Sequence, residues 1–404
     1  MINLNFAHLF VEQYTNDYLL VDFVEESEFI YFRNNGDYIE KMTLREYEPT
    51  MLLFKHVGKL PLKEGELFTI PMEQLIEIKN IYRNRIQRDN STEEKPMNVY
   101  MMFSNGEFIT NLFECKQANK SSPRKYREEV RGTWDDGTPC SLNNLTSNFF
   151  VKVLDVGQGS TNLIYDEKTL TIFDCGVSMG YSKLESVDVL ERMKASFDFY
   201  RKISLIISHW DCDHYNLLTL MDDKLISCFC CIFIPSTVIS LTAKSVVKKI
   251  YKNCRYIRTF SPLPISKKRK IGIQPIIAKK NYELYVGEKC NSINKSGLAL
   301  IVKGDCDAVI LSADHSNYQI WDCIYPLSVQ GACSKMNIVV PHHGGDCGKI
   351  NVKYLSEQAG VAVVSVGKNG YKHPQQKTID TYNNFGFEIK RTDWERTDIV
   401  IHVQ

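Results

Sequence analysis

One loop constrains the fold of this chain more than any other stretch of its sequence. An apolar run at residues 203–207 predicts a buried strand, and a cluster of polar side chains follows it directly. Four side chains that can bind a metal ion occupy six consecutive positions there: His209, Asp211, Asp213 and His214. A turn of this length can direct His209 and Asp211 to one point and Asp213 and His214 to an adjacent one. We therefore predict that this loop supplies ligands to two divalent ions, Zn²⁺ or Mn²⁺.

Three later apolar runs end in the same kind of residue. The run at 309–313 ends at Asp314, the run at 337–341 ends at His342 and His343, and the run at 363–366 is followed by His373. Each is ordinary alone, because a single Asp or His after a strand is usually a turn or cap residue. Their joint occurrence behind the first loop favours one site built from several strand ends.

Changes in composition and in the pattern of apolar residues divide the chain into two parts and a connection. Residues 149–404 alternate strand-like apolar runs with helical patterns, which predicts an α/β or α+β domain. Residues 1–115 are rich in aromatic and β-branched residues, and we expect short strands at 18–24, 29–32 and 99–103. Residues 116–148 are polar and are predicted to form a linker.

Charge and cysteine content narrow the function classes. The chain has 49 Lys and Arg and 48 Asp and Glu, which gives a net charge of +1. Strong binding to nucleic acid or an anionic membrane through net charge alone is therefore not expected. No apolar run is long enough for a membrane span. The 13 cysteines are scattered, apart from Cys228, Cys230 and Cys231 in a strand-like run. We expect free thiols and a cytoplasmic protein.

Several motifs of residues 149–404 resemble those of a known family. The loop His209-x-Asp211-x-Asp213-His214 resembles the signature loop of the metallo-β-lactamase fold, in its variant with Asp at the second ligand position. The stretches LDVGQGS at 154–160 and IFDCG at 172–176 resemble the "DVGQGDA … IDTG" opening of the branch that contains the soluble domain of the competence protein ComEC and phosphorylcholine esterases. PHHGG at 341–345, SVGKNGYKHP at 365–374 and RTD at 391–393 resemble that branch's "PHHGS", "SVGxNxYGHP" and "RTD".

The resemblance implies an α+β fold, the metallo-β-lactamase αββα sandwich at 149–404, behind a smaller β-rich N-terminal domain. It also implies ligands for two ions. The first ion would be held by His209, Asp211 and one His of the pair, more readily His343 than His342. The second would be held by Asp213, His214 and His373, and Asp314 would bridge both.

Further roles follow from the same resemblance. Asp213, His342 and Asp314 are the residues expected to act in catalysis, with His342 free to contact substrate or move a proton. Asp174 would support the ligand loop from behind. The chain departs from the branch at Ser312-Ala313, where the branch has Thr-Gly, and at Lys372, where it has Gly. Lys372 would place a cation beside His373, which favours an anionic substrate, or it is simply an exposed lysine.

These expectations leave three functions open. The first is a metal-dependent phosphodiesterase, foremost a nuclease, for which the basic run at 267–270 is a candidate phosphate contact. The second is a hydrolase of a small phosphoester, such as a cyclic nucleotide or a phosphorylcholine-like group, which suits the near-zero net charge equally well. In the third, residues 1–115 are an interaction module that recruits the hydrolase to a protein partner in a multi-protein assembly of bacterial defence type.

Overall fold

The computed structural model describes the C-terminal part of the chain and a set of strands before it. The described residues are 6–14, 18–25, 50–55, 67–77 without 75, 99–103, 128–129, and 145–404 without 147, 201, 239, 266–269, 291, 330–331, 351–357, 368, 370 and 371. They belong to two compact units. Unit 1 comprises residues 1–130, 181–185 and 237–252, and unit 2 comprises residues 131–180, 186–236 and 253–404. The predicted linker at 116–148 lies mostly outside the described residues and stays a prediction.

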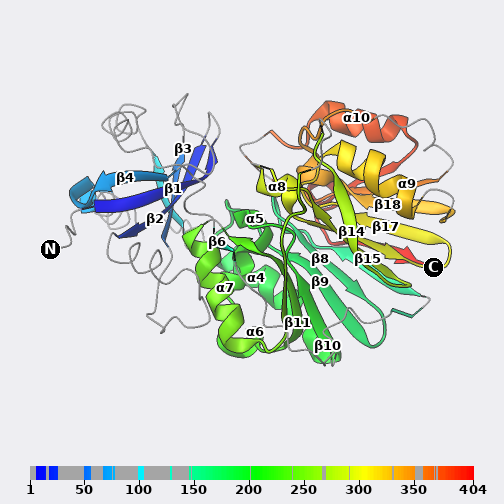
Figure 1. The fold of residues 1–404 in the computed structure, drawn as a ribbon, viewed down its shortest axis with the longest axis horizontal. Coiled ribbons are helices and arrows are strands. Elements are labelled where there is room, and N and C mark those ends of the chain that lie inside the picture. Colours follow the sequence, from blue (N-terminus) through cyan, green and yellow to red (C-terminus); the bar gives the residue numbers. More distant parts are fainter. Residues whose placement is uncertain are drawn as a thin grey trace. The chain divides into compact units, whose positions relative to one another are not determined.

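A five-stranded sheet forms the main element of unit 1 (Figure 1). Its order is β4-β1-β2-β3-β5, with β1 (Phe6–Tyr14), β2 (Tyr18–Glu25), β3 (Thr50–Lys55), β4 (Leu67–Pro71) and β5 (Val99–Phe103). The strands expected at 18–24 and 99–103 are thus β2 and β5, while 29–32 lies outside the described residues. The expectation of a β-rich N-terminal domain is confirmed.

Unit 1 also takes in a helix that the chain reaches much later. This helix is α7 (Leu241–Asn253), preceded by the short strand β12 (Thr237–Val238), which pairs with β6 (Glu128–Glu129). The buried carboxylate of Asp22 in β2 accepts the backbone N–H of Thr242 at 2.7 Å. This charge-assisted bond satisfies one of the free N–H groups at the start of α7.

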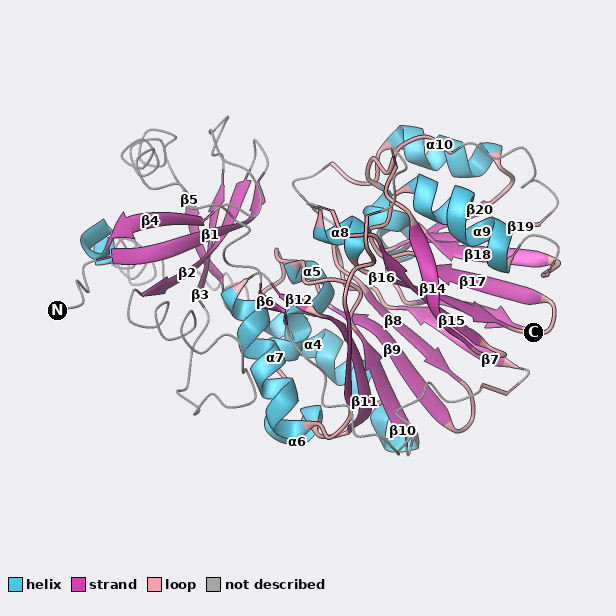
Figure 2. Ribbon diagram, viewed as in Figure 1, coloured by secondary structure: helices cyan, strands magenta, loops and turns pink. Residues whose placement is uncertain are grey.

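Unit 2 contains two seven-stranded mixed sheets (Figure 2). Sheet A has the order β13-β11-β10-β9-β8-β7-β21. Its strands are β7 (Phe149–Val153), β8 (Thr161–Tyr165), β9 (Thr169–Cys175), β10 (Lys202–Ile206), β11 (Phe229–Pro235), β13 (Ile257–Phe260) and β21 (Ile399–Val403). Sheet B has the order β14-β15-β16-β17-β18-β19-β20. Its strands are β14 (Ile273–Ala278), β15 (Tyr282–Gly287), β16 (Leu298–Lys303), β17 (Asp307–Leu311), β18 (Lys335–Val339), β19 (Ala359–Val364) and β20 (Glu388–Arg391).

The two sheets share one apolar core, and helices cover their outer faces. Side chains from both sheets meet in that core, among them Phe233 of β11 and Leu300 of β16. A second apolar cluster joins the other face of sheet B to η6 (Tyr318–Ile324), α9 (Tyr325–Ser328) and α10 (Gln376–Asn384). On sheet A, α4 (Lys183–Lys194) and η4 (Phe197–Phe199) supply the outer layer, where Phe197 contacts Phe229 of β11. The predicted αββα sandwich is confirmed.

Both sheets repeat one strand pattern. In sheet A, β7, β8 and β9 are antiparallel, and β9, β10, β11 and β13 are parallel. In sheet B, β15, β16 and β17 are antiparallel, and β17, β18, β19 and β20 are parallel. The carboxyl ends of parallel strands meet at one edge of a sheet, which is where loops can share a site.

Two further expectations meet the structure here. None of the described helices combines the length and the apolar character needed to cross a membrane. Ten of the described cysteines are free thiols, but Cys231 in β11 is disulfide-bonded. The expectation of free thiols was therefore wrong at Cys231.

The turn between β8 and β9 gives a test of the fold. The carboxylate of Asp166 accepts the N–H groups of Thr146, Lys168 and Thr169, each at 2.8 Å. Burial opposes ionisation, but these bonds lower the pKa of Asp166 below its usual value. We expect Asp166→Ala to lower the free energy of unfolding at neutral pH by about 2 kcal/mol.

The pH dependence of that loss provides its control. A lowered pKa stabilises the fold above the unfolded-state value near 3.8, and this contribution disappears as the pH falls through the folded-state pKa. Urea unfolding of the wild type and Asp166→Ala at neutral and acidic pH should show a smaller difference in acid. A difference of equal size at both pH values would contradict the role given to the ionised carboxylate.

Candidate metal centre

The candidate site lies where parallel strands of both sheets end. In sheet A, β10 leads into the loop that carries His209, Asp211, Asp213 and His214. In sheet B, β17 leads to Asp314, β18 leads to His342 and His343 in η7 (Pro341–Gly344), and the loop after β19 carries His373. Residues that are separated by as many as 164 positions in sequence, His209 and His373, therefore reach the same edge of the sandwich.

The ligand loop is folded tightly against the end of β9. Helix α5 (Cys212–Tyr215) begins directly after Asp211, and the N–H of His214 donates to the carbonyl of Asp211 at 2.9 Å. Gly176 lies behind this turn, so close that an added Cβ would stand 2.0 Å from the carbonyl oxygen of Asp213. Only glycine permits this approach, which fixes the backbone that carries Asp213 and His214.

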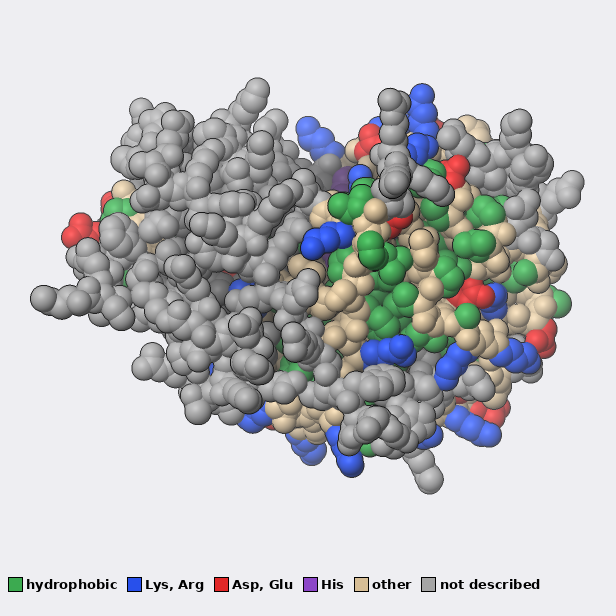
Figure 3. All heavy atoms as spheres, viewed as in Figure 1, with side chains coloured by type: hydrophobic (Ala, Val, Ile, Leu, Met, Phe, Trp, Pro, Cys, Tyr) green, Lys and Arg blue, Asp and Glu red, His purple; other side chains and the backbone are tan. Residues whose placement is uncertain are grey.

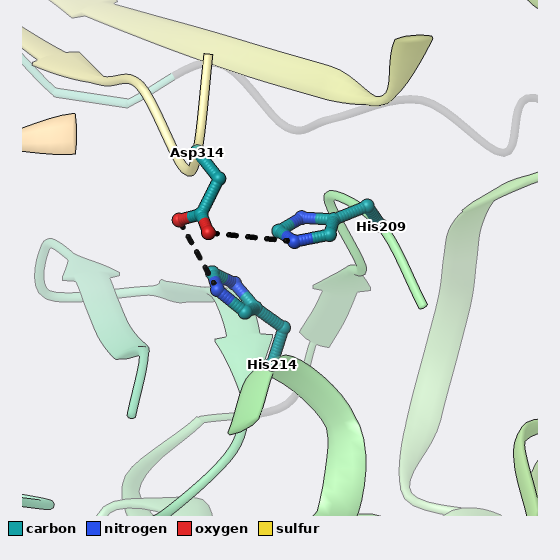
Figure 4. A group of neighbouring side chains, drawn as sticks. All are labelled: His209, His214 and Asp314. Atoms are coloured by element: carbon teal, nitrogen blue, oxygen red, sulfur yellow. Dashed lines mark ion pairs between the residues drawn. The ribbon is translucent and has the colours of Figure 1, made fainter. Parts of the chain in front are cut away.

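Two groups of buried side chains bring metal-type ligand atoms together, and they share His214. The first consists of His209, His214 and Asp314 (Figure 4), with His214 Nε2 3.3 Å from Asp314 Oδ1 and His209 Nε2 3.8 Å from Asp314 Oδ2. The second consists of Asp213, His214 and His343, with His343 Nε2 3.4 Å from Asp213 Oδ2. Ligand atoms within each group lie within 4.8 Å of one another.

The outer nitrogens of two histidines are engaged by neighbouring acceptors. His214 Nδ1 lies 2.8 Å from Asp174 Oδ2, and His343 Nδ1 lies 2.9 Å from the carbonyl oxygen of Ser365. Because both partners accept, each Nδ1 carries a proton. Each Nε2 would then offer its lone pair to a bound ion. This is the arrangement that orients histidine as a metal ligand.

The chemistry of the unpartnered atoms tests whether the residues fit a divalent ion. Four buried atoms at the centre of the two groups have no hydrogen-bond partner among the described residues: His209 Nε2, His214 Nε2, His343 Nε2 and Asp314 Oδ1. Buried polar atoms are nearly always hydrogen-bonded, so four unpartnered acceptors facing one another call for a bound cation. The set fits one or more divalent ions with nitrogen and oxygen ligands.

The other predicted site residues lie around this centre. Asp211 Oδ2 stands 3.3 Å from His209 Nε2, and His342 Nδ1 stands 2.5 Å from Asp314 Oδ2. The ring of His373 lies 5.1 Å from that of His342, and its Nδ1 is 3.4 Å from Gln158 Nε2. All seven predicted ligands and His342 are thus brought to one region.

The grouping of the ligands differs from the one that the resemblance implies. His343 lies with Asp213 and His214, whereas the resemblance places it with His209 and Asp211. His373 was expected beside Asp213 and His214, and it is a member of neither described group. His315, which follows Asp314, is buried and belongs to neither group.

Burial and neighbouring charges set the protonation of the site. Burial opposes the charge on Asp314, but His342 and His214 lower the pKa of its carboxyl well below the usual range. Burial also opposes the charge on His342, yet the Asp314 carboxylate raises its pKa to about 9. Burial and the imidazoles of His342 and His343 lower the pKa of His373 to about 4, which keeps its ring neutral.

One residue at the site was not found from the sequence. Asn294, in α8 (Ile293–Ser296), donates from Nδ2 to Asp314 Oδ2 at 3.2 Å. It comes from the connection between two antiparallel strands, β15 and β16, and no strand-end motif marks it. No signal in the sequence pointed to it.

Left-handed backbone is concentrated at the site. Six described residues other than glycine have positive φ, and five of them are ligands, neighbours of ligands or the supporting carboxylate: Asp174, Ala313, His342, His343 and Lys372. Ala313 and Lys372 are the positions where the resembled branch has glycine. Their φ values of 46° and 60° explain that preference, because glycine adopts such φ without steric cost.

Comparison with known proteins returns structural likeness only. No protein-family model and no curated protein matches the chain. Solved structures that resemble it include the metallo-beta-lactamase fold protein YhfI from Bacillus subtilis, with 14% identity over 63% of this chain and 99% of that one and a TM-score of 0.36. Tm1679, a metal-dependent hydrolase of the beta-lactamase superfamily, has 11% identity over 63% and 98% and a TM-score of 0.34.

Human tRNase Z, short form, is a third such structure, with 11% identity over 62% of this chain and 98% of that one and a TM-score of 0.35. The metal centre is inferred from the buried ligand atoms of this chain.

Replacement of the supporting carboxylate tests the metal centre. Asp174→Asn keeps the size of the side chain, but its amide cannot accept from both Ser208 and His214 as the carboxylate does. The ring of His214 would then lose its fixed proton at Nδ1. We expect affinity for Zn²⁺ to fall by about 10- to 100-fold, measured by competition with a chelator.

Asp346→Asn is the matched control, because Asp346 is an exposed carboxylate outside both groups. It should bind Zn²⁺ as the wild type does. Unchanged affinity in Asp174→Asn would contradict the orienting role.

Backbone strain at Ala313 gives a stability test. Ala313→Gly should raise the free energy of unfolding by up to about 1 kcal/mol, since relief of left-handed strain exceeds the added freedom of the unfolded chain. Ala308→Gly in β17, a strand position outside the positive-φ set, should instead lower it by roughly 1 kcal/mol or more. Equal destabilisation in both variants, measured by urea unfolding, would show that Ala313 stores no strain.

Proposed function

We propose that this chain is a dinuclear metal-dependent hydrolase of phosphodiesters, with nucleic acid as the leading substrate class. The observation that carries the proposal is the convergence of four buried, unpartnered ligand atoms from the strand ends of two sheets. Divalent ions held there would neutralise charge on a phosphoryl oxygen and lower the pKa of a water molecule. The six motifs quoted above support the further proposal that the chain belongs to the ComEC-like branch.

The ligands proposed for the ions are His209, Asp211, Asp213, His214, Asp314, His343 and His373. Three carboxylates accompany four imidazoles in this set. It is richer in oxygen than a histidine-dominated zinc site, so Mn²⁺ stands beside Zn²⁺ as the proposed metal.

His342 is the residue proposed to handle a proton. Its Nδ1 is engaged by Asp314, while 36% of its side chain is exposed, which leaves Nε2 open to the substrate side. Its position beside Asp314, with part of the ring exposed, places it to exchange a proton with the leaving oxygen of a phosphodiester.

A small phosphoester is the second candidate substrate, because the chain offers little bulk attraction for a polyanion. The net charge is +1, and on the described part of the face in Figure 3 the Lys and Arg side chains lie in separate groups among other residues. In the basic run at 267–270, residues 267–269 lie outside the described residues, and Lys270 packs on the ring of Tyr318. That run adds no support for a nucleic-acid contact.

The role of the N-terminal part is a separate proposal. Both groups of metal-capable side chains found among the described residues lie in unit 2. This supports a non-catalytic role for residues 1–115, such as binding a protein partner. A cytoplasmic location is proposed because the cysteines are scattered along the sequence.

The activity test compares a ligand variant with a matched surface variant. Asp213→Ala should reduce the hydrolysis of bis(p-nitrophenyl) phosphate with Mn²⁺ or Zn²⁺ by a factor on the order of 10³ or more, because it removes a ligand of the shared His214 group. Asp346→Ala, at an exposed carboxylate paired with Lys377, should keep wild-type activity.

Single-stranded and double-stranded nucleic acids and cyclic nucleotides serve as parallel substrates. Preference for a cyclic nucleotide over both nucleic acids would favour the second candidate. Cleavage that survives Asp213→Ala would contradict the proposed active site.

A further inference from the structure

The connection between β15 and β16 lies against the candidate site, although its sequence contains no recognised motif. The N–H of Leu298 donates to the carbonyl of Ser208 at 2.8 Å, next to the first ligand of the loop. Gly297 packs so closely that an added Cβ would lie 2.5 Å from the Ser208 oxygen and 3.1 Å from the Cβ of His209. The helical turn α8 is therefore held against the ligand loop by its backbone.

The turn is also fixed from the other side. Gln319 Nε2 donates to the carbonyl of Lys295 at 2.7 Å, and an added Cβ on Gly287 would stand 2.0 Å from the same carbonyl oxygen. The residues that follow Asn294 in this turn thus have little room to move. A side chain carried here is presented to the site from a rigid element.

Asn294 contacts one oxygen of Asp314 and not the other. Its Nδ2 donates to Asp314 Oδ2 at 3.2 Å, and the same oxygen accepts from His342 Nδ1 at 2.5 Å. Since a carboxylate only accepts, the amide nitrogen must be the group that faces it. Oδ1 has no hydrogen-bond partner among the described residues and lies 3.3 Å from His214 Nε2.

The two oxygens of Asp314 therefore have different surroundings. A carboxylate oxygen offers about two lone pairs, and protein donors engage both lone pairs of Oδ2. Only Oδ1 is left for a cation. This differs from the bridge between both ions that the family resemblance implies for Asp314.

We infer that Asn294 is a positioning residue that, together with His342, turns Asp314 so that Oδ1 alone serves as a ligand beside His214. The inference rests on the proposed function, because it concerns the same metal centre. Without the Asn294 amide, His342 alone holds Oδ2, and the carboxylate rotates more freely about its last bond. Holding it in place then costs entropy at the moment an ion binds.

Metal binding by the full chain tests this inference without any activity assay. The probes are Zn²⁺ in chelator competition and Co²⁺, whose visible absorption reports ligand geometry. The variant is Asn294→Ala. The matched control is Ser296→Ala in the same turn, because the hydroxyl of Ser296 donates to the carbonyls of Ser292 and Ile293 and not to Asn294 or Asp314. Thermal unfolding monitored by circular dichroism verifies that both variants fold.

We expect Asn294→Ala to bind one ion about 10- to 100-fold more weakly than the wild type and to change the Co²⁺ spectrum. Ser296→Ala should stay within about twofold of the wild type on both readouts. Wild-type affinity and spectrum in Asn294→Ala would overturn the inference while leaving the metal centre intact. Equal losses in both variants would overturn it as well, because the turn rather than the amide would then be responsible. A wild type that binds no ion would overturn the proposed function and this inference with it.

Discussion

The buried carboxylate of Asp174 is the interaction on which the candidate site depends most. It accepts the N–H of Ser208 at 2.7 Å, the hydroxyls of Ser208 and Ser160 at 2.9 and 3.1 Å, and His214 Nδ1 at 2.8 Å. A buried charge is tolerated only when it is satisfied in this way. Asp174 thus joins the end of β9, the turn between β7 and β8, and the ligand loop. It also decides which nitrogen of His214 faces the site.

Local backbone strain accompanies this arrangement. Asp174, His342 and His343 have φ values of 62°, 52° and 52°, a region that costs residues with a Cβ about 1–2 kcal/mol each. Such conformations persist where the surrounding structure fixes them, and here two sheets with a common apolar core do so. The core thus holds the side chains in a geometry that the loops would not adopt alone.

The sequence predicts the fold, and it predicts that the candidate ligands reach one region, for a physical reason. The ligand-type residues follow apolar runs, and parallel strands bring their ends to one edge, so that co-location follows from topology. Which ligands lie together is harder to predict from the sequence. It depends on the left-handed turn at His342 and His343, which places His343 beside Asp213. Asn294 could not be predicted, because it arrives on a connection without any pattern. The inclusion of residues 237–252 in unit 1 likewise depends on tertiary contacts that no local signal reveals.

Anomalous diffraction can show directly whether ions bind among His209, Asp213, His214, Asp314 and His343. Crystals of the full chain grown with Zn²⁺ or Mn²⁺ would be measured on both sides of the metal absorption edge. The account predicts two anomalous peaks among these side chains, one of them within bonding distance of Asp314 Oδ1. Crystals that diffract well and show no peak there, or show peaks only elsewhere on the protein, would contradict it.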